Sequence, residues 1–138
     1  MQKGRKVPLA LLLAVLLLAP ASAYMGKQLA RGPVDSFTLT DQSGENYTFG
    51  IDTEGVVVVS FIFTRCPDVC PVLTQSLSAV EAELTEDERK DVTFVSITVD
   101  PEYDTPEALT EYSERMGASW PHLTGTAEEL QPVWDMFA

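Results

Sequence analysis

The segment VVVVSFIFTRCPDVCP, residues 56–71, carries the strongest structural signal of the sequence. Its first half is almost entirely β-branched or aromatic, which is typical of a strand covered on both faces. Cys66 and Cys70, the only two cysteines of the chain, follow directly. The two thiols are therefore predicted to lie in a strand-to-helix turn, because apolar residues after them recur at helical spacing and predict one buried helix face. These residues are Leu73, Leu77, Val80 and Leu84.

The predicted turn affects the acidity of the two thiols. Unpaired N–H groups and the positive end of the helix dipole stabilise a thiolate, and Arg65 acts in the same direction. Asp68, between the two cysteines, acts in the opposite direction. Pro71 fits the first helical turn, because the N–H group that it lacks would have no partner there. Two neighbouring thiolates suit the soft ion Cu(I), and they equally suit reversible disulfide formation.

Four roles compete for the cysteine pair. A structural zinc site normally needs four ligands, and the chain offers two cysteines and one histidine. A structural disulfide across so short a loop would stabilise the fold by only about 2 kcal/mol in the chain-entropy model. A redox-active dithiol and a copper site are the stronger interpretations, and we rank the copper site first.

A second apolar run, residues 92–99, predicts a neighbouring strand. Strand, helix and strand in this order imply a right-handed crossover and a parallel pair. Functional groups in such sheets gather beyond the carboxyl ends of the strands, so Cys66 and Asp100 are expected at the same edge. Asp100 either tunes the thiols or a bound metal from a distance, or serves as a turn residue before Pro101. We favour the turn.

The remaining patterns predict a hairpin and two more helices. Alternating residues on both sides of the turn at residues 41–44 predict the hairpin. A helix is expected to begin at Thr105-Pro106-Glu107 and to end at Gly117. Its buried face would consist of Leu109, Tyr112 and Met116. We expect Met116 to pack in the core rather than to bind a metal. The capping box Thr126-x-x-Glu129 opens a last helix, in which Pro132 should weaken or bend the apolar stripe Leu130, Val133, Trp134 and Phe137.

Three blocks, in order, resemble the signatures of the Sco/SenC copper metallochaperones. They are residues 61–71, with a proline after each cysteine; Ser96-Ile97-Thr98-Val99-Asp100-Pro101-Glu102 with Asp104-Thr105-Pro106-Glu107; and Trp120 with Leu123-Thr124-Gly125-Thr126. The likeness runs from about Val34 to the last residue. It implies an α/β, thioredoxin-like fold with a central, mostly parallel sheet and an N-terminal β-hairpin. It also implies a role in assembling the dinuclear copper centre of cytochrome c oxidase, with Cys66 and Cys70 as thiolate ligands.

The sequence departs from this family pattern at the third copper ligand. The family uses a histidine ahead of a late strand, beyond the part that matches residues 126–137. The only histidine here, His122, lies inside the third block, and we expect it to be solvated in a surface turn rather than to bind metal. We therefore expect Cu(I) at two thiolates, with Cu(II) binding only in a longer form that supplies the histidine. The chain is expected to be a fragment without the C-terminal strands and helix of the family fold.

The N-terminus predicts export. Residues 1–23 combine a basic start, an apolar run and a small-residue cleavage site, which is typical of a signal peptide that is either removed or kept as a membrane anchor. Residues 24–33 are interpreted as a linker, and residues 34–138 as the incomplete thioredoxin-like domain. The domain would then face the extracytoplasmic side of a membrane, where a dithiol needs a thiol reductant before it can bind Cu(I).

The charge of the chain excludes some partners. Removing the three basic residues of the predicted signal takes the net charge from −12 to −15. So acidic a domain is unsuited to nucleic acid or to adsorption on anionic lipid. Together with the leader-like N-terminus, the family resemblance implies an exported copper metallochaperone, not an enzyme, whose partner is the copper-bearing subunit of cytochrome c oxidase. The alternative is a thiol–disulfide oxidoreductase that acts on cysteines of exported or oxidase proteins, with Cys66 and Cys70 as catalytic residues.

Overall fold

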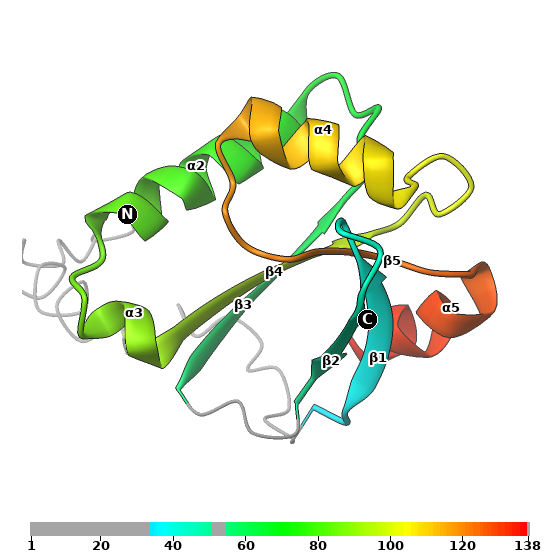
Figure 1. Cartoon of the computed structure of the whole chain (residues 1–138), viewed down its shortest axis with the longest axis horizontal. Coiled ribbons are helices and arrows are strands. Elements are labelled where there is room, and N and C mark those ends of the chain that lie inside the picture. Colours follow the sequence, from blue (N-terminus) through cyan, green and yellow to red (C-terminus); the bar gives the residue numbers. More distant parts are fainter. Residues whose placement is uncertain (1–33, 51–54, 138) are drawn as a thin grey trace, which may run out of the picture. The chain divides into compact units, whose positions relative to one another are not determined.

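The computed structural model describes residues 34–50 and 55–137, which belong to one compact unit, Val34–Ala138 (Figure 1). The predicted signal peptide and linker lie outside the described residues. The strands are β1 (Phe37–Asp41), β2 (Asn46–Phe49), β3 (Val56–Ile62), β4 (Val92–Thr98) and β5 (His122–Thr124). The helices are α2 (Val69–Glu83), the short α3 (Glu88–Asp91), α4 (Pro106–Met116) and α5 (Ala127–Met136).

The strands form one mixed sheet in the order β2-β1-β5-β4-β3. β3, β4 and β5 are parallel, with Val59 opposite Val95, so the predicted parallel pair is confirmed. β1 runs antiparallel to both β2 and β5 and thereby joins the predicted hairpin to the sheet. Sequence periodicity did not reveal β5, because three residues are too few to show an alternation. The fold is α/β and thioredoxin-like, as predicted.

Side chains on the two faces of the sheet enter different cores, as the period of two along a strand requires. On one face, Val95 and Ile97 of β4 pack with Leu123 and with Leu130 of α5. On the other face, Ile62 and Phe94 pack beneath α2 and α4. Figure 1 shows α2 and α4 together on one side of the sheet and α5 on the other. The two cysteines belong to the core beneath α2 and α4.

The buried face of α2 differs from the prediction. Leu73 is 40% exposed and Val80 is 51% exposed, whereas the fully buried residues of this helix are Cys70 and Thr74. Leu77 is partly buried against the neighbouring core. The helix is therefore rotated by about one residue from the predicted orientation, since successive residues of an α-helix are about 100° apart. A hydrogen bond between the hydroxyls of Thr74 and the buried Tyr112 compensates for placing a polar residue at this position.

Both predicted helix starts in the second half of the chain are confirmed. The Thr105 side chain accepts a hydrogen bond from the N–H group of Ala108, with Pro106 at the first position of α4. Gly117 ends α4 in the left-handed conformation, at φ 66°. Thr126 and Glu129 form the predicted capping box of α5, and this helix continues through Pro132 to Met136.

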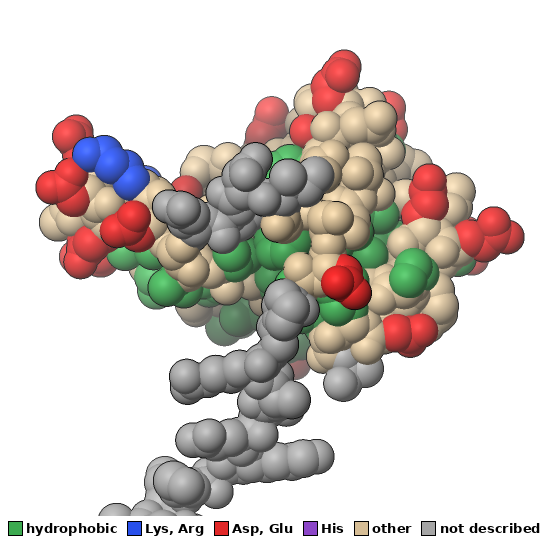
Figure 2. Space-filling model, turned by 90° about the horizontal axis from the view of Figure 1, so that it is seen from below, with side chains coloured by type: hydrophobic (Ala, Val, Ile, Leu, Met, Phe, Trp, Pro, Cys, Tyr) green, Lys and Arg blue, Asp and Glu red, His purple; other side chains and the backbone are tan. Residues whose placement is uncertain are grey.

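The surface of the described residues is strongly acidic. In Figure 2, acidic side chains lie mainly at the left, upper and right edges of the face shown, basic side chains gather at the left, and hydrophobic atoms lie between them. Among residues 34–50 and 55–137, no helix is both long enough and apolar enough to cross a bilayer.

Candidate functional site

The two thiols lie where the sequence predicts them, between the end of β3 and the first turn of α2. Cys66 is 7% exposed and Cys70 is 5% exposed, and neither forms a disulfide. The N–H group of Cys66 donates to the carbonyl of Phe63 and closes a turn, with a distance of 3.1 Å. The N–H group of Cys70 donates to the sulfur of Cys66, with a distance of 3.4 Å. Local backbone geometry therefore holds the two cysteines against each other.

The pKa values of the two thiols shift in opposite directions. The pKa of Cys66 is lowered, first by the backbone N–H group of Asp68 and then by the Cys70 thiol and the Cys70 N–H group. These donors stabilise the thiolate, as expected at a helix start. The pKa of Cys70 is raised, chiefly by burial, and also by its hydrogen bond to Cys66 and by the charge of Asp104. Cys66 is therefore the thiol that loses its proton first.

A thiol with a lowered pKa beside one with a raised pKa can perform two kinds of chemistry. Cys66 can attack a disulfide, after which Cys70 is close enough to resolve the mixed disulfide. Both sulfurs can also hold one Cu(I), which accepts two soft thiolate ligands. The walls around the sulfurs are apolar, formed by Ile62, Leu109 and Tyr112, with Phe63 and Met116 at the periphery.

Asp104 anchors the turn that precedes the cysteines. The residue is completely buried in the connection between β4 and α4. Its carboxylate accepts hydrogen bonds from the Thr64 N–H group at 3.1 Å and the Thr64 hydroxyl at 2.6 Å, and also from the Thr98 hydroxyl. A buried carboxylate is tolerated only when its oxygens are satisfied in this manner. Asp104 thus ties the end of β3 to the end of β4.

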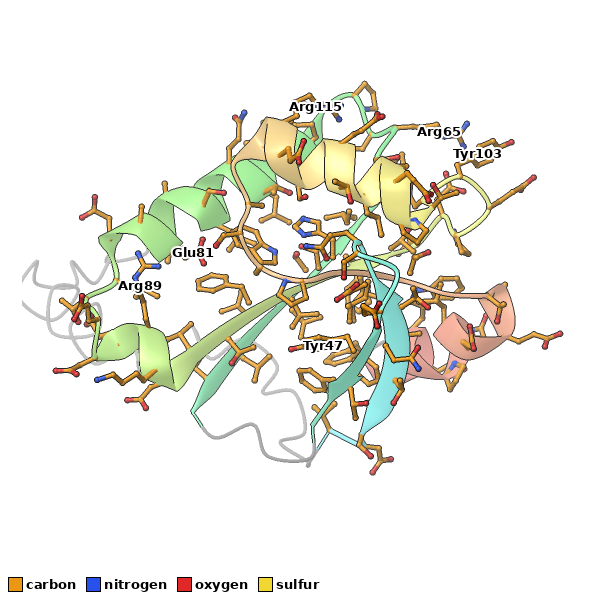
Figure 3. All side chains as sticks on the ribbon, viewed as in Figure 1. Tyr47, Arg65, Glu81, Arg89, Tyr103 and Arg115 are labelled. Atoms are coloured by element: carbon orange, nitrogen blue, oxygen red, sulfur yellow. The ribbon has the colours of Figure 1, made fainter. Side chains whose placement is uncertain are left out.

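The guanidinium of Arg65 is paired with a carboxylate and an aromatic ring, and no direct contact with a thiol is seen among the described residues. The guanidinium donates to the carboxylate of Asp100 at 2.9 Å and lies 3.3 Å from the centre of the Tyr103 ring (Figure 3). The leading causes of the lowered Cys66 pKa are neighbouring hydrogen-bond donors. The Arg65–Asp100 pair also shows that the ends of β3 and β4 share one edge, as predicted.

Asp100 itself is a turn residue, as favoured from the sequence. Its carbonyl accepts hydrogen bonds from the N–H groups of Tyr103 and Asp104, which shapes the connection between β4 and α4. Its own N–H group donates to the Thr98 hydroxyl at 2.9 Å. The backbone of Asp100 thus supports the segment that carries Asp104.

The prediction for His122 is wrong in one respect. The residue opens β5 and is fully buried, not solvated in a surface turn. It stacks on Trp120, and its Nδ1 lies 2.9 Å from the Trp120 carbonyl. Nε2 has no hydrogen-bond partner among the described residues, and burial lowers the pKa of the imidazole. The sequence could not show this, because the central position of the short strand β5 was not recognised.

The structure brings two candidate metal ligands together, Cys66 and Cys70. Within residues 34–50 and 55–137, no cluster of three or more His, Cys, Asp or Glu side chains is arranged to hold an ion. Met116 packs between two apolar clusters beneath α2 and α4, as predicted for a core residue. Among the described residues, the soft donor atoms that lie together are therefore the sulfurs of Cys66 and Cys70.

Sequence reasoning missed the polar residues that support the thiols. Thr64, Thr98 and Asp104 have no recognisable spacing, since they come together only when β3 and β4 pair. Thr74 was also missed, although its hydroxyl lies 2.8 Å from the Tyr112 hydroxyl in the core beneath the cysteines. The available signals were the threonine among the apolar positions of α2 and the three family blocks, which include Thr64, Thr98 and Asp104.

Together, the mixed sheet and the dithiol at the start of α2 define a thioredoxin-like protein with a paired-cysteine site. Residues 27–138 match the SCO1/SenC family model. The chain belongs to the SCO1/SenC family.

Known members of this family are similar in sequence and fold. The human mitochondrial SCO1 homolog is 36% identical over 111 residues, which is 80% of this chain and 36% of that protein. Copper-bound ScoI of Bradyrhizobium japonicum has a TM-score of 0.67 at 30% identity and matches 77% of this chain and 67% of that one. BsSco, a Sco-family cytochrome c oxidase assembly protein with a disulfide switch, has a TM-score of 0.65 at 29% identity, over 80% and 64% of the two chains. The chain spans 36–54% of the first curated relatives that it matches.

Proposed function

We propose that this protein is a copper metallochaperone that helps to assemble the dinuclear copper centre of cytochrome c oxidase. Cys66 and Cys70 would bind one Cu(I) ion as cargo. The observation that carries the proposal is the buried, unlinked thiol pair at the start of α2, held together by the hydrogen bond from the Cys70 N–H group to the Cys66 sulfur. Family membership and the copper-bound relative from Bradyrhizobium support it.

The different acidities of the two thiols suggest an order of loading. Cys66, whose pKa is lowered, would offer its thiolate to the incoming ion first. Cys70, whose pKa is raised by burial, would release its proton as the second bond to the metal forms. Two thiolates suit Cu(I), whereas Cu(II) prefers nitrogen and oxygen donors in a tetragonal arrangement. Binding of Cu(II) would therefore need nitrogen or oxygen donors in addition to the two thiolates.

The copper would be received and passed on outside the cytoplasm. We propose that residues 1–23 direct export and either are cleaved or anchor the protein to the membrane. The oxidising conditions there favour a disulfide between Cys66 and Cys70, so a thiol reductant must act before loading. The acceptor would be the copper-bearing subunit of the oxidase.

Competition with a Cu(I) chelator tests the proposal. The reduced chain should take up one Cu(I), and Cys66→Ser or Cys70→Ser should each abolish this uptake, because a single thiolate cannot replace a pair. The matched control is Met116→Leu, which removes the other nearby sulfur and keeps the apolar packing. The control should bind as the wild type does. Unchanged uptake in either cysteine variant would reject the assignment.

A second candidate function is thiol–disulfide oxidoreductase. The lowered pKa of Cys66 beside a second thiol favours it, as does the disulfide switch described for BsSco. An oxidoreductase should reduce an exported protein disulfide over many cycles when a dithiol reductant regenerates it. A single stoichiometric reduction, without turnover, would count against this function. Cys66→Ser should remove any turnover, because Cys66 is the attacking thiol.

A further inference from the structure

The buried carboxylate of Asp104 connects three separate parts of the chain. One oxygen accepts from the Thr64 hydroxyl at 2.6 Å, and both lie within 3.2 Å of the Thr64 nitrogen. The second oxygen also accepts from the hydroxyl of Thr98, the last residue of β4. The backbone N–H group of Asp104 donates to the carbonyl of Asp100 at 3.0 Å. Asp104 therefore makes hydrogen bonds to the segment before Cys66, to β4 and to the connection leading to α4.

The hydrogen bonds from Thr64 to Asp104 are not needed to pair β3 with β4. β3 and β4 already pair over seven residues, and the N–H group of Val99 extends the ladder to the carbonyl of Ile62. Thr64 lies beyond this ladder, in the turn between β3 and α2. Its N–H group and its hydroxyl both point to the same carboxylate. The carboxylate thus fixes the part of the turn that the sheet does not reach, two residues before Cys66.

We propose that Asp104, through Thr64, is a positioning residue that holds the turn so that the Cys66 sulfur stays against Cys70. This inference rests on the proposed role of the two cysteines as a functional pair. Closure of the turn by the Cys66 N–H group and the contact of the Cys70 N–H group with the Cys66 sulfur depend on where Thr64 is held. A fixed turn raises the effective concentration of one sulfur at the other, because less chain entropy is lost when the two sulfurs are joined.

The thiol–disulfide exchange equilibrium of the full chain with glutathione tests whether Asp104 positions the two sulfurs. Oxidised glutathione takes two electrons and two protons from the pair, so that one Cys66–Cys70 disulfide and two molecules of reduced glutathione result. Thr64→Val keeps the shape and removes the hydroxyl donor. It should lower the equilibrium constant for disulfide formation by at most about tenfold, because the turn that holds the Cys66 sulfur against Cys70 loses one hydrogen bond to a carboxylate. Thr64→Ser keeps the donor and should restore the wild-type value.

Two controls separate positioning from stability. Val133→Ala creates a cavity in the core on the opposite face of the sheet and lowers stability, but it should leave the glutathione equilibrium unchanged. Thr98→Val removes the other hydroxyl donor to Asp104 and takes the place of Thr64→Val if that variant does not fold. The inference is overturned if Thr64→Val matches the wild type, or if Val133→Ala shifts the equilibrium as much.

Copper uptake by the same variants distinguishes this inference from the proposed function. Thr64→Val should weaken Cu(I) binding relative to Thr64→Ser, since the same two sulfurs must converge on the metal. Failure of the wild type to bind Cu(I) would overturn the proposed function. The glutathione equilibrium would still decide whether Asp104 positions the pair.

Discussion

Cys66 and Cys70 are identical residues four positions apart, yet their surroundings move their pKa values in opposite directions. Both are buried, Cys66 in the turn before α2 and Cys70 in the first turn of this helix. The difference is that the sulfur of Cys66 accepts hydrogen bonds, whereas the sulfur of Cys70 is buried without equivalent compensation. Proximity to a helix start is thus not sufficient to activate a thiol, because the direction of the nearest N–H groups and the local burial determine which sulfur becomes the thiolate.

The opposite pKa shifts suggest different roles for the two sulfurs. In the proposed function, Cys66 would be the attacking or first-binding sulfur and Cys70 the second one. The Cys70 thiol is itself one of the donors that lower the pKa of Cys66, so each cysteine contributes to the state of the other.

The largest effect expected from this contrast is in thiol reactivity. At pH 7, iodoacetamide should modify Cys66 faster than Cys70, because the thiolate is the reacting form and the two pKa values shift in opposite directions. Mass spectrometry of the reduced protein at early times identifies the modified residue. Equal rates at both sulfurs would contradict the contrast.

Single substitutions test how each cysteine shifts the pKa of the other. Cys70→Ala should raise the pKa of Cys66, because a hydrogen-bond donor is lost, and Cys66→Ala should lower the pKa of Cys70, because its hydrogen bond to Cys66 is lost. The pH dependence of alkylation reports both shifts. Arg65→Gln is the matched control, since its guanidinium is engaged with Asp100 and Tyr103. This control should change the alkylation of Cys66 little.

Much of the framework could be predicted from the sequence because its signals are local. Caps, the turn glycine and alternating apolar residues act within a few positions, and they correctly placed the hairpin, the parallel pair β3–β4 and the starts of α4 and α5. The position of the thiols followed from the same signals. The orientation of α2 did not, because its buried face depends on α4, where Thr74 finds the hydroxyl of Tyr112.

The parts that could not be predicted depend on long-range pairing. Asp104 meets Thr64 across 40 residues of sequence, and no periodic pattern marks such a contact. The burial of His122 follows from the insertion of β5 between β1 and β4. A histidine in a segment of three strand residues looks like a turn residue until its neighbours in the sheet are known.

A smaller effect is expected on the pH dependence of stability. Burial disfavours the charged form of the His122 side chain, as it disfavours the thiolate of Cys70. Burial lowers the pKa of this imidazole below its ordinary value of 6.5, so the unfolded chain binds a proton more readily than the folded one. Stability should therefore be retained above pH 6.5 and fall below it, at up to about 1.4 kcal/mol per pH unit. Urea unfolding between pH 7 and pH 5 measures this slope.

The matched variant for this prediction is His122→Asn, whose side-chain N–H group can still donate to the Trp120 carbonyl. Because His122 is the only histidine of the chain, the slope between pH 6.5 and pH 5 should largely disappear in the variant. The carboxylates with lowered pKa values, such as those of Glu88 and Glu129, lose their stabilising contribution only at more acidic pH. An equal slope in both proteins would show that burial of His122 does not oppose its protonation.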